Sequence, residues 1–384
     1  MKSKTIGLLA GITIVGILLA VFANREPSSN LPQSGQLLFP DLMSVVNDVN
    51  EVVIETKDQT ITLVRGEKDW GVKEKSSYRA DLEKVKQAIV GLADLRIHEP
   101  KTQNPELYER LGLQDKDQEG SASKTVTVKT ADNAETAKVV MGNQRPAKGN
   151  PRMSDIYIRK PGDPQTWLAI GNVPIETMPD EWLDKEVTAL PTNRVRQVTV
   201  THPKGETLHL SKMKPDELDF HLDVIPTGFK VSSQFNVNNV VGTLVQLSFE
   251  DVKPQAEIDF SANPGVSAVL ETFDGLRLHV QTTKLNEQVW GKFSAEFDDS
   301  LIQPSQSETK QEDTEKSKGA ETEKGEKDIG ADIPMKESIL KKPEEVQQEV
   351  ETLNQRVKDW AYVLPSFRVE NFSKVKKDLI AMGE

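Results

Sequence analysis

The sequence predicts an α+β protein in which an N-terminal transmembrane helix precedes repeated β-β-(β)-α modules with antiparallel sheets and one-sided helices. Three observations support this fold class. An uncharged apolar run lies near the N-terminus, short alternating stretches precede helical patterns, and one such pattern recurs at a constant spacing. The chain has 384 residues, of which 36% are hydrophobic, so it is long and apolar enough to form two ordinary domains.

The apolar run covers residues 5–23 and is close to the roughly 20 residues that cross a bilayer core. The apolar part of a signal peptide is shorter, about 7 to 15 residues. Lys2 and Lys4 precede the run, and such positive residues stay in the cytoplasm. We therefore predict that residues 1–25 are a single-pass anchor in a bacterial inner membrane, with the N-terminus cytoplasmic and the bulk of the chain periplasmic. The small residues around Phe22 leave a cleaved signal peptide as the alternative.

Two glycines, Gly7 and Gly11, lie about one helical turn apart within this run. Small residues at this spacing allow a partner helix to approach closely, so both are candidate membrane-helix contacts. The alternative is that they reflect the general frequency of glycine in membrane helices.

A polar tether rich in Pro, Ser and Gly covers residues 26–37, and the first folded domain is expected over residues 38–185. Val49–Glu55 and Thr60–Arg65 alternate apolar and polar residues, which predicts a β-hairpin. Asp69–Val72 would add a third strand.

A helix follows this predicted hairpin, and four more strands complete the first domain. Asp81 is a favourable N-cap, and the apolar residues after it recur at spacings of three and four. The expected buried face of the helix consists of Leu82, Val85, Ile89, Leu92 and Leu95. The four strands are expected over Thr125–Lys129, Ala137–Gly142, Asp155–Lys160 and Gln165–Gly171.

The second domain, over residues 186–302 and 343–384, repeats this organisation. Val195–Thr201 and Glu206–Ser211 form a strand pair, and Asn236 opens a helix. The apolar positions of this helix match those of the first at a constant offset of 155 residues, and they are Val237, Val240, Leu244 and Leu247. A constant offset over a cap and four core positions indicates an internal duplication.

The C-terminus contains a third segment that resembles this pattern. Residues 360–380 resemble residues 70–90 at a single offset of 290, with a tryptophan at the start of each stretch. We expect a third module whose strands are Ala268–Thr272, Leu276–Gln281 and Gln288–Phe293.

A Lys/Glu-rich insertion occupies residues 303–342. It has few apolar residues and cannot bury enough surface to offset the entropy cost of ordering, so we predict that it is disordered. From Pro343 a helix resumes with a coiled-coil-like apolar seam about two heptads long. We expect this helix to pack against its own sheet through Val346, Val350, Leu353, Val357 and Trp360.

Composition and motifs indicate that this chain is not an enzyme. The net charge of -12 disfavours nucleic acid as a partner, and the lack of cysteine excludes disulfides and thiol catalysis. None of the five histidines has the i, i+4 spacing of a metal pair, and neither a G-x-S-x-G elbow nor a P-loop occurs. We therefore predict no catalytic, metal-binding or cofactor-binding residues. A pocket that joins His209 or His221 to a carboxylate and a serine would support a hydrolase instead.

One basic segment, MGNQRPAKGNPR over residues 141–152, lies between two predicted strands. Backbone N–H groups together with Arg145, Lys148 and Arg152 would form a candidate anion-binding loop for a lipid head group or an acidic glycan. The alternative is a long hairpin loop whose Gly and Asn residues adopt turn conformations.

The N-terminal anchor, the segments VVIETKDQTITLVRGEKDWGV and YRADLEKVKQAIVGLADL, and then LYERLGL, VVMGN and DIYIRK together resemble the domain of unknown function 4340 family. Through the repeat, the likeness extends to DWAYVLPSF near the C-terminus. Members of that family resemble envelope proteins encoded beside ABC-type transport components of the gliding-motility auxiliary kind. The resemblance implies an accessory subunit with no catalytic residues to carry over, and the charged insertion departs from the family pattern.

The functional expectation is a non-enzymatic, membrane-anchored accessory or scaffold protein whose modules face the periplasm and dock a transporter or envelope partner. The alternative is a periplasmic binding module for an anionic envelope ligand, held by the loop over residues 141–152.

Overall fold

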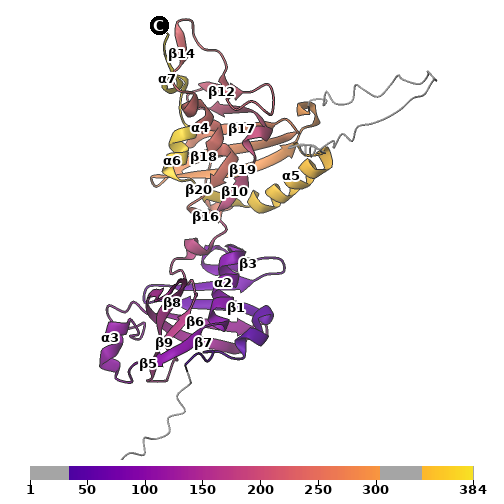
Figure 1. Ribbon diagram of the computed structural model, residues 1–384. Coiled ribbons are helices and arrows are strands. Elements are labelled where there is room, and N and C mark those ends of the chain that lie inside the picture. The colour runs from indigo at the N-terminus through magenta and orange to yellow at the C-terminus, as the bar shows by residue number, and fades with distance from the viewer. Residues whose placement is uncertain (1–33, 303–339, 384) are drawn as a thin grey trace, which may run out of the picture. The chain divides into compact units, whose positions relative to one another are not determined.

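The computed structural model describes residues 34–302 and 340–383. The chain divides into two compact units, Met1–Trp182 (unit 1) and Leu183–Glu384 (unit 2), and each unit contains its own large sheet (Figure 1). The division lies close to the one predicted after residue 185. Large antiparallel sheets with a few helices confirm the predicted α+β class. The predicted anchor, with Gly7 and Gly11, lies outside the described residues.

Unit 1 contains a nine-stranded sheet with the order β4-β3-β2-β1-β6-β7-β8-β9-β5, in which all neighbours are antiparallel. Its strands are β1 (Val49–Glu55), β2 (Thr60–Arg65), β3 (Trp70–Val72), β4 (Tyr78–Arg79), β5 (Arg96–Pro100), β6 (Lys124–Thr130), β7 (Glu135–Ala147), β8 (Asn150–Arg159) and β9 (Thr166–Gly171). Its described α-helices are α2 (Leu82–Ala93) and α3 (Tyr108–Leu111).

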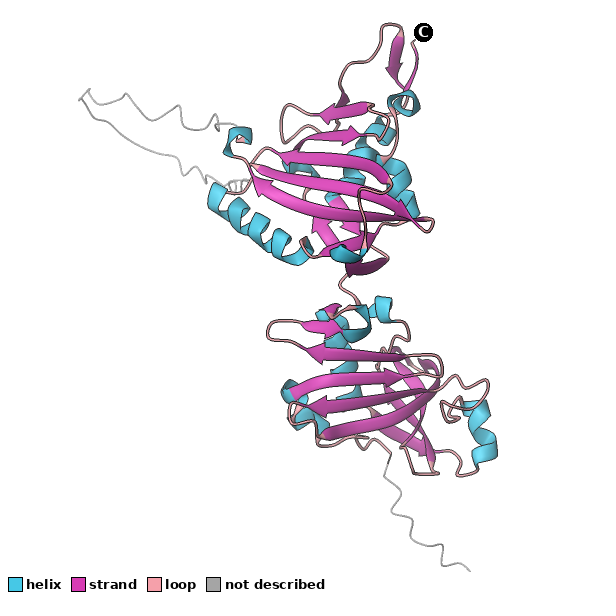
Figure 2. Ribbon diagram, turned by 180° about the vertical axis from the view of Figure 1, so that it is seen from behind, coloured by secondary structure: helices cyan, strands magenta, loops and turns pink. Residues whose placement is uncertain are grey.

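Helix α2 begins as its sequence predicts. The Asp81 carboxylate accepts hydrogen bonds from the N–H groups of Glu83 and Lys84, which is the expected N-cap. The predicted apolar face is buried from Val85 onward, whereas Leu82, the first helical residue, is 40% exposed. The buried face of the helix therefore begins almost one turn later than predicted. Figure 2 shows the strands in front and this helix behind them.

Strands β7 and β8 run through the segment predicted as a loop. β7 continues to Ala147 and β8 begins at Asn150, so only Lys148 and Gly149 form the turn. Gly149 has a φ of +82°, which glycine adopts without strain. The loop prediction was wrong. Gly, Asn and Pro residues are typical of turns, but here they lie in a two-stranded ribbon whose backbone pairing tolerates them.

Unit 2 contains an eight-stranded antiparallel sheet and two small two-stranded sheets. Its strands are β10 (Glu186–Ala189), β11 (Val195–Thr201), β12 (Thr207–Ser211), β13 (His221–Leu222), β14 (Phe229–Val231), β15 (Gln246–Ser248), β16 (Asp251–Pro254), β17 (Pro264–Thr272), β18 (Leu276–Leu285), β19 (Gln288–Phe297), β20 (Trp360–Val363) and β21 (Ile380–Met382). Its α-helices are α4 (Gln234–Val245), α5 (Pro343–Val357), α6 (Ser366–Phe372) and α7 (Lys376–Leu379).

The large sheets of the two units have the same strand order. In unit 2 the order is β13-β12-β11-β17-β18-β19-β20-β16, which corresponds strand by strand to β3-β2-β1-β6-β7-β8-β9-β5 in unit 1. Helix α4 follows β11, β12 and β13, and α2 follows the corresponding β1, β2 and β3 and the additional β4. Eight corresponding strands in one order are the arrangement that a duplication produces.

The pairing register supports the same correspondence. The ladder between β1 and β6 shifts between Val49 and Glu51, and the ladder between β11 and β17 shifts between Val195 and Gln197. The irregularity lies at the second residue of the strand in both units. Bulges are specific local features rather than random defects, so this match indicates a shared origin for the two sheets.

The expected third module does not form. Strand β20 belongs to the second sheet, where Trp360 lies opposite Pro254, just as Trp167 of β9 lies opposite Pro100 of β5 in unit 1. The C-terminal tryptophan is therefore the counterpart of Trp167. Where residues 70–90 carry one long helix, residues 360–380 carry the two short helices α6 and α7. The three strands assigned to the third module are β17, β18 and β19 of the second sheet.

Two observed boundaries differ from the predicted ones. Helix α4 begins at Gln234 with Ser233 at its N-cap, two residues before the predicted start at Asn236. The tether ends earlier than predicted, because the Gly35 N–H donates to the Ile97 carbonyl of β5 and so fixes this residue to the sheet.

Helix α5 covers part of the second sheet and has no counterpart in unit 1. It lies in the segment between β19 and β20, whereas a short loop joins β8 and β9. The apolar seam predicted for α5 is buried at Val346, Val350, Leu353 and Val357, and the helix packs beside β19 as expected. Of the insertion predicted over residues 303–342, residues 303–339 lie outside the described residues, and the Lys341 N–H donates to Asp274 over 3.0 Å.

Candidate functional site

The basic segment predicted to bind anions is the far end of the β7–β8 hairpin. Arg145 and Asp155 lie opposite each other in the ladder, and their side chains pair with 3.2 Å between Nε and Oδ2. Lys148 and Arg152 are exposed at and after the turn. The hairpin therefore presents three exposed cations, of which Arg145 is held by a carboxylate of its own strand pair.

His209 and His221 each lie beside one polar side chain. His209 Nδ1 lies 3.1 Å from the hydroxyl of Thr199, and His221 Nε2 lies 3.8 Å from a Glu217 oxygen. The nearby Ser211 donates to Asp223 rather than to either histidine. Within residues 34–302 and 340–383, no cluster of three metal-ligating side chains occurs.

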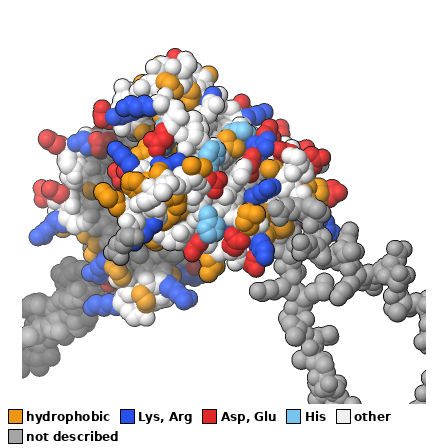
Figure 3. All heavy atoms as spheres, turned by 90° about the horizontal axis from the view of Figure 1, so that it is seen from above, with side chains coloured by type: hydrophobic (Ala, Val, Ile, Leu, Met, Phe, Trp, Pro, Cys, Tyr) orange, Lys and Arg blue, Asp and Glu red, His pale blue; other side chains and the backbone are white. Residues whose placement is uncertain are grey.

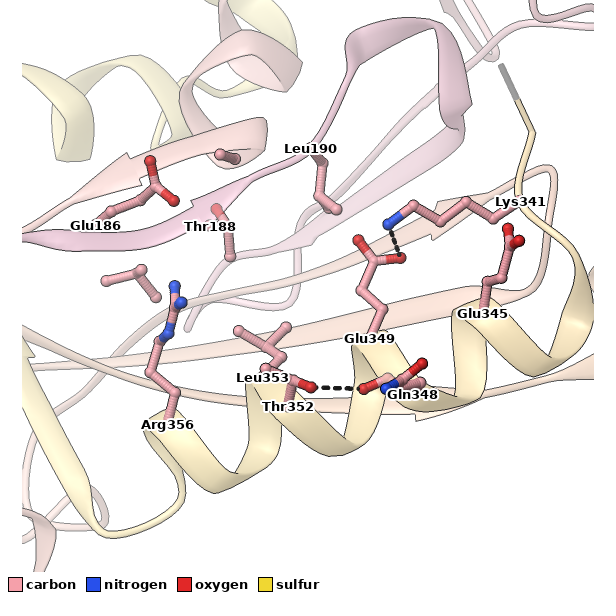
Figure 4. A pocket seen from close by; sticks show the side chains of 12 residues that line it. Glu186, Thr188, Leu190, Lys341, Glu345, Gln348, Glu349, Thr352, Leu353 and Arg356 are labelled. Carbon is pink, nitrogen blue, oxygen red and sulfur yellow. Dashed lines mark hydrogen bonds and ion pairs between the residues drawn. The ribbon is translucent and has the colours of Figure 1, made fainter. Parts of the chain in front are cut away.

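A groove of about 530 Å³ lies in unit 2 between strand β10 and helix α5 (Figure 4). Thr188 and Leu190 point into it from the strand, and Leu353 and Arg356 point into it from the helix (Figure 4). All residues of β10, and Leu190 directly after it, line the groove.

An ion-pair network closes one end of this groove. Glu349 of α5 accepts hydrogen bonds from both terminal nitrogens of Arg194, at 2.8 and 3.0 Å, and its Oε2 lies 3.1 Å from Lys341 Nζ. Arg194 also forms an ion pair with Asp274. Burial by itself would raise the pKa of Asp274, but hydrogen bonds from Arg194, Thr272 and the Lys341 N–H outweigh it and lower this pKa.

At the other end of the groove, one nitrogen of Arg356 has no acceptor among the described residues. This nitrogen is the buried Nε atom. The Arg356 side chain points from α5 into the groove, below Thr188 (Figure 4). A ligand that carries an acceptor could therefore pair with this guanidinium inside the groove.

A second surface gathers exposed apolar side chains at one end of unit 2, and we call it the apex. It is defined by Leu218, Val224, Ile225, Phe229, Phe235 and Met382. Hydrogen bonds tie its segments together: Asn238 of α4 donates to Asp219, and Phe229 pairs with Met382 across the small sheet of β14 and β21. Figure 3 looks onto unit 2 from above and shows hydrophobic side chains at the surface among charged ones.

The apex contains an unusual backbone conformation. Val224 is 80% exposed and has a φ of +56°, in the left-handed region that β-branched residues rarely adopt. Such strain persists only where surrounding structure holds it, and it concentrates at functional sites. Phe235, at the start of α4, is 72% exposed.

The groove and the apex were both missed by sequence reasoning. The groove joins residues 186–190 to residues 341–356, and these become neighbours only when α5 folds onto the second sheet. No pattern in the sequence singled out the apex residues.

Among the described residues, no helix is long and apolar enough to cross a membrane. No curated protein matches the chain. The model of the domain of unknown function DUF4340 matches residues 70–262, which cover the larger part of unit 1 and the part of unit 2 up to the β16–β17 connection. Because this match extends over half of the chain, the protein belongs to the DUF4340 family.

Proposed function

We propose that this protein is a non-enzymatic, membrane-anchored accessory or scaffold protein that faces the bacterial periplasm and docks a protein partner of an ABC-type transport or envelope complex. The apolar run over residues 5–23, preceded by two lysines, supports the anchor and its orientation. The family resemblance supports the kind of complex.

The observation that carries the docking role is the apex. Large apolar side chains that are exposed in one region of a folded unit favour a contact with another protein, and aromatic side chains contribute most to such contacts. Phe235 and Phe229 supply aromatic anchors, and the strained backbone at Val224 holds another apolar side chain outward.

The experiment places a photoreactive phenylalanine analogue at position 235 in the full chain and irradiates intact cells. We expect a crosslinked adduct with one protein of the membrane or envelope, and we expect Val224→Ser combined with Phe229→Ser to reduce its yield. The matched control places the analogue at position 367, because Phe367 is 59% exposed on α6 and lies outside the apex. Equal labelling from both positions, or none from position 235, would contradict docking at the apex.

The anchor needs its own measurement. We expect the full chain, Met1 included, to remain in the membrane fraction while protease added to spheroplasts cleaves between residues 303 and 338. A mature chain that begins at Asn24 in the soluble fraction would mean a signal peptide, and a free periplasmic binding protein would become the better description.

The second candidate function is binding of an anionic envelope ligand by the end of the β7–β8 hairpin. The observation in its favour is the exposure of Lys148 and Arg152 beside the turn. Vesicles that contain an anionic phospholipid are a direct probe. Binding that is unchanged after Arg145→Ala and Arg152→Ala would remove this candidate.

A further inference from the structure

Lys292 of β19 and Arg159 of β8 occupy equivalent positions in the two large sheets. Each belongs to a row of directly opposite residues that ends at the last residue of β11 or of its counterpart β1. In unit 2 the row is Lys292, Gln281, Ser267 and Thr201. In unit 1 the row is Arg159, Val140, Thr125 and Glu55. The duplication has therefore placed a cation at the same point of both sheets.

Both cations lie over an aromatic ring. The Arg159 guanidinium is 5.0 Å from the centre of the Tyr108 ring, and Lys292 Nζ is 4.9 Å from the centre of the Phe260 ring. Tyr108 lies between β5 and β6, and Phe260 lies between the corresponding strands β16 and β17. A cation is attracted to the face of an aromatic ring, so the two units share this contact as well as the strand register.

The two cations differ in their carboxylate partner. Arg159 Nη2 lies 2.5 Å from Asp115 Oδ1, and the Arg159 side chain is only 8% exposed. Asp115 belongs to the connection between β5 and β6, over residues 101–123, whereas the connection between β16 and β17 is much shorter, over residues 255–263. Lys292 forms no ion pair with any described residue. The shorter connection therefore leaves Lys292 without the carboxylate that its counterpart has.

A pocket of about 520 Å³ lies at this point of the second sheet, and we call it the outer pocket. His279 and Gln281 of β18 and Lys292 and Ser294 of β19 line it, together with Gln255. Residues two apart on a strand point to the same face, so these strand residues project from one face of the sheet. The volume is within the range of ordinary ligand-binding clefts, and the amide and hydroxyl groups can form hydrogen bonds with a ligand.

The charges that line the outer pocket are those of Lys292, Lys358 and Glu296. Glu296 accepts a hydrogen bond from Arg277 at 2.8 Å, and it lies four residues beyond Lys292 on β19, which is about 13 Å along a strand. Lys358 has a carboxylate 4.0 Å away, in Asp359. Lys292 is therefore the charge in this pocket that has no counter-ion, and an anionic group at its end of the pocket would supply one.

We propose that the outer pocket binds a small ligand through a carboxylate, which pairs with Lys292 as Asp115 pairs with Arg159 in unit 1. The other polar groups of the ligand bond to Gln281 and Ser294. The outer pocket is separate from the apex and from the β7–β8 hairpin, and the proposal does not depend on either.

The test uses ligand-observed NMR with the purified full chain in mild detergent. One pair of probes is D-glucuronate and D-glucose, and the other is L-alanyl-L-aspartate and L-alanyl-L-asparagine. We expect at least one of the acids to bind about tenfold or more tightly than its neutral partner, because it adds a charge-assisted contact. The pair that shows this preference identifies the source of the carboxylate as an acidic sugar or an acidic peptide.

Variants of the chain locate the contact. Lys292→Gln should remove the preference for the acid, whereas Lys292→Arg should keep it, because arginine is the cation at this position in unit 1. Lys284→Gln is the matched control, since Lys284 is also an exposed lysine of β18 but lies outside the pocket lining and pairs with Glu287. The proposal is overturned if neither acid binds more tightly than its neutral partner, or if the Lys292→Gln and Lys284→Gln variants bind the acid equally well.

Discussion

Arg194 and Asp274 form a two-point ion pair inside unit 2. Arg194 Nε lies 2.7 Å from Asp274 Oδ2, Arg194 Nη2 lies 3.2 Å from Oδ1, and the two side chains are 1% and 2% exposed. Arg194 precedes β11, and Asp274 lies in the turn between β17 and β18. Because Arg194 also binds Glu349, this pair joins helix α5 to the turn of the sheet.

The corresponding turn in unit 1 has the same hydrogen bond between a threonine and an aspartate, but its aspartate is not buried. Thr130 donates to Asp132 after β6, as Thr272 donates to Asp274 after β17, with 2.6 Å between the oxygens in both. Asp132 is exposed, whereas Asp274 is buried against Arg194. A turn shared by the two repeats has therefore become the attachment point for α5 in unit 2 alone.

Replacing Arg194 should destabilise unit 2 strongly. In Arg194→Met the Asp274 carboxylate stays buried without its principal partner, and loss of one member of a buried pair costs about 3–5 kcal/mol. Urea unfolding of the full chain would show the transition of unit 2 moving to lower urea. Arg145→Met is the control: its partner is Asp155, the Arg145 side chain is 60% exposed, and we expect a change of about 0–1 kcal/mol. Equal shifts in the two variants would contradict the role of burial.

The same pair predicts how stability depends on pH. The pKa of Asp274 is lowered in the folded chain, whereas an aspartate in the unfolded chain has a pKa of about 4. The pair therefore stabilises unit 2 fully above about pH 4 and loses this contribution as the pH falls through the lowered pKa. The stability difference between the wild-type chain and Asp274→Asn should shrink as the pH falls below about 4. A difference that stays constant from pH 6 to pH 3 would show that Asp274 does not titrate with a lowered pKa.

Two helical glycines should respond in opposite ways to alanine. A Cβ at Gly91 of α2 would clash with the backbone oxygen of Asn172, so Gly91→Ala should destabilise unit 1 by about 1–3 kcal/mol. A Cβ at Gly242 of α4 would meet nothing within 4 Å. Gly242→Ala should therefore stabilise unit 2 by about 0.5–1 kcal/mol, because alanine is the better helix former. Thermal unfolding of both variants measures the signs, and shifts of the same sign would be inconsistent with these contacts.

Asn354 should protect an open strand edge. Its side-chain amide accepts from the Ala295 N–H at 2.8 Å and donates to the Ala295 carbonyl at 2.7 Å, beyond the two residues where β19 pairs with β20. Asn354→Ala removes both bonds and should cost about 1–3 kcal/mol, with faster hydrogen exchange at Ala295. Gln355→Ala, an exposed neighbour, should change stability by less than about 0.5 kcal/mol. Unchanged exchange at Ala295 would show that the amide does not seal the edge.

Local patterns predicted local structure well in this chain. The strands Val49–Glu55 and Thr60–Arg65 have the predicted bounds, and the Asp81 cap is confirmed, because alternation and capping depend on neighbouring residues. The family was also recognisable from short segments. The continuation of the two strands through Arg145 was missed because Gly, Pro and Asn occur in ribbons as well as in loops, and only cross-strand pairing distinguishes the two.

Similarity along the sequence did not by itself define the modules. Trp360 matched Trp70 by spacing, but its strand pairing makes it the counterpart of Trp167. A spacing pattern records that two segments are alike, whereas the position of a strand in a sheet depends on which strand it pairs with.

The sequence by itself determined the α+β class, the first hairpin, the capped helix and the buried seam of α5, because each follows from periodicity or from a side chain bonding its own segment. Only the tertiary structure decided which strands share a sheet, that Asp274 is buried by Arg194 while Asp132 stays at the surface, and that Arg356 and β10 line one groove. These relationships join residues far apart in the chain, and they depend on how apolar faces pack against one another, which no local pattern specifies.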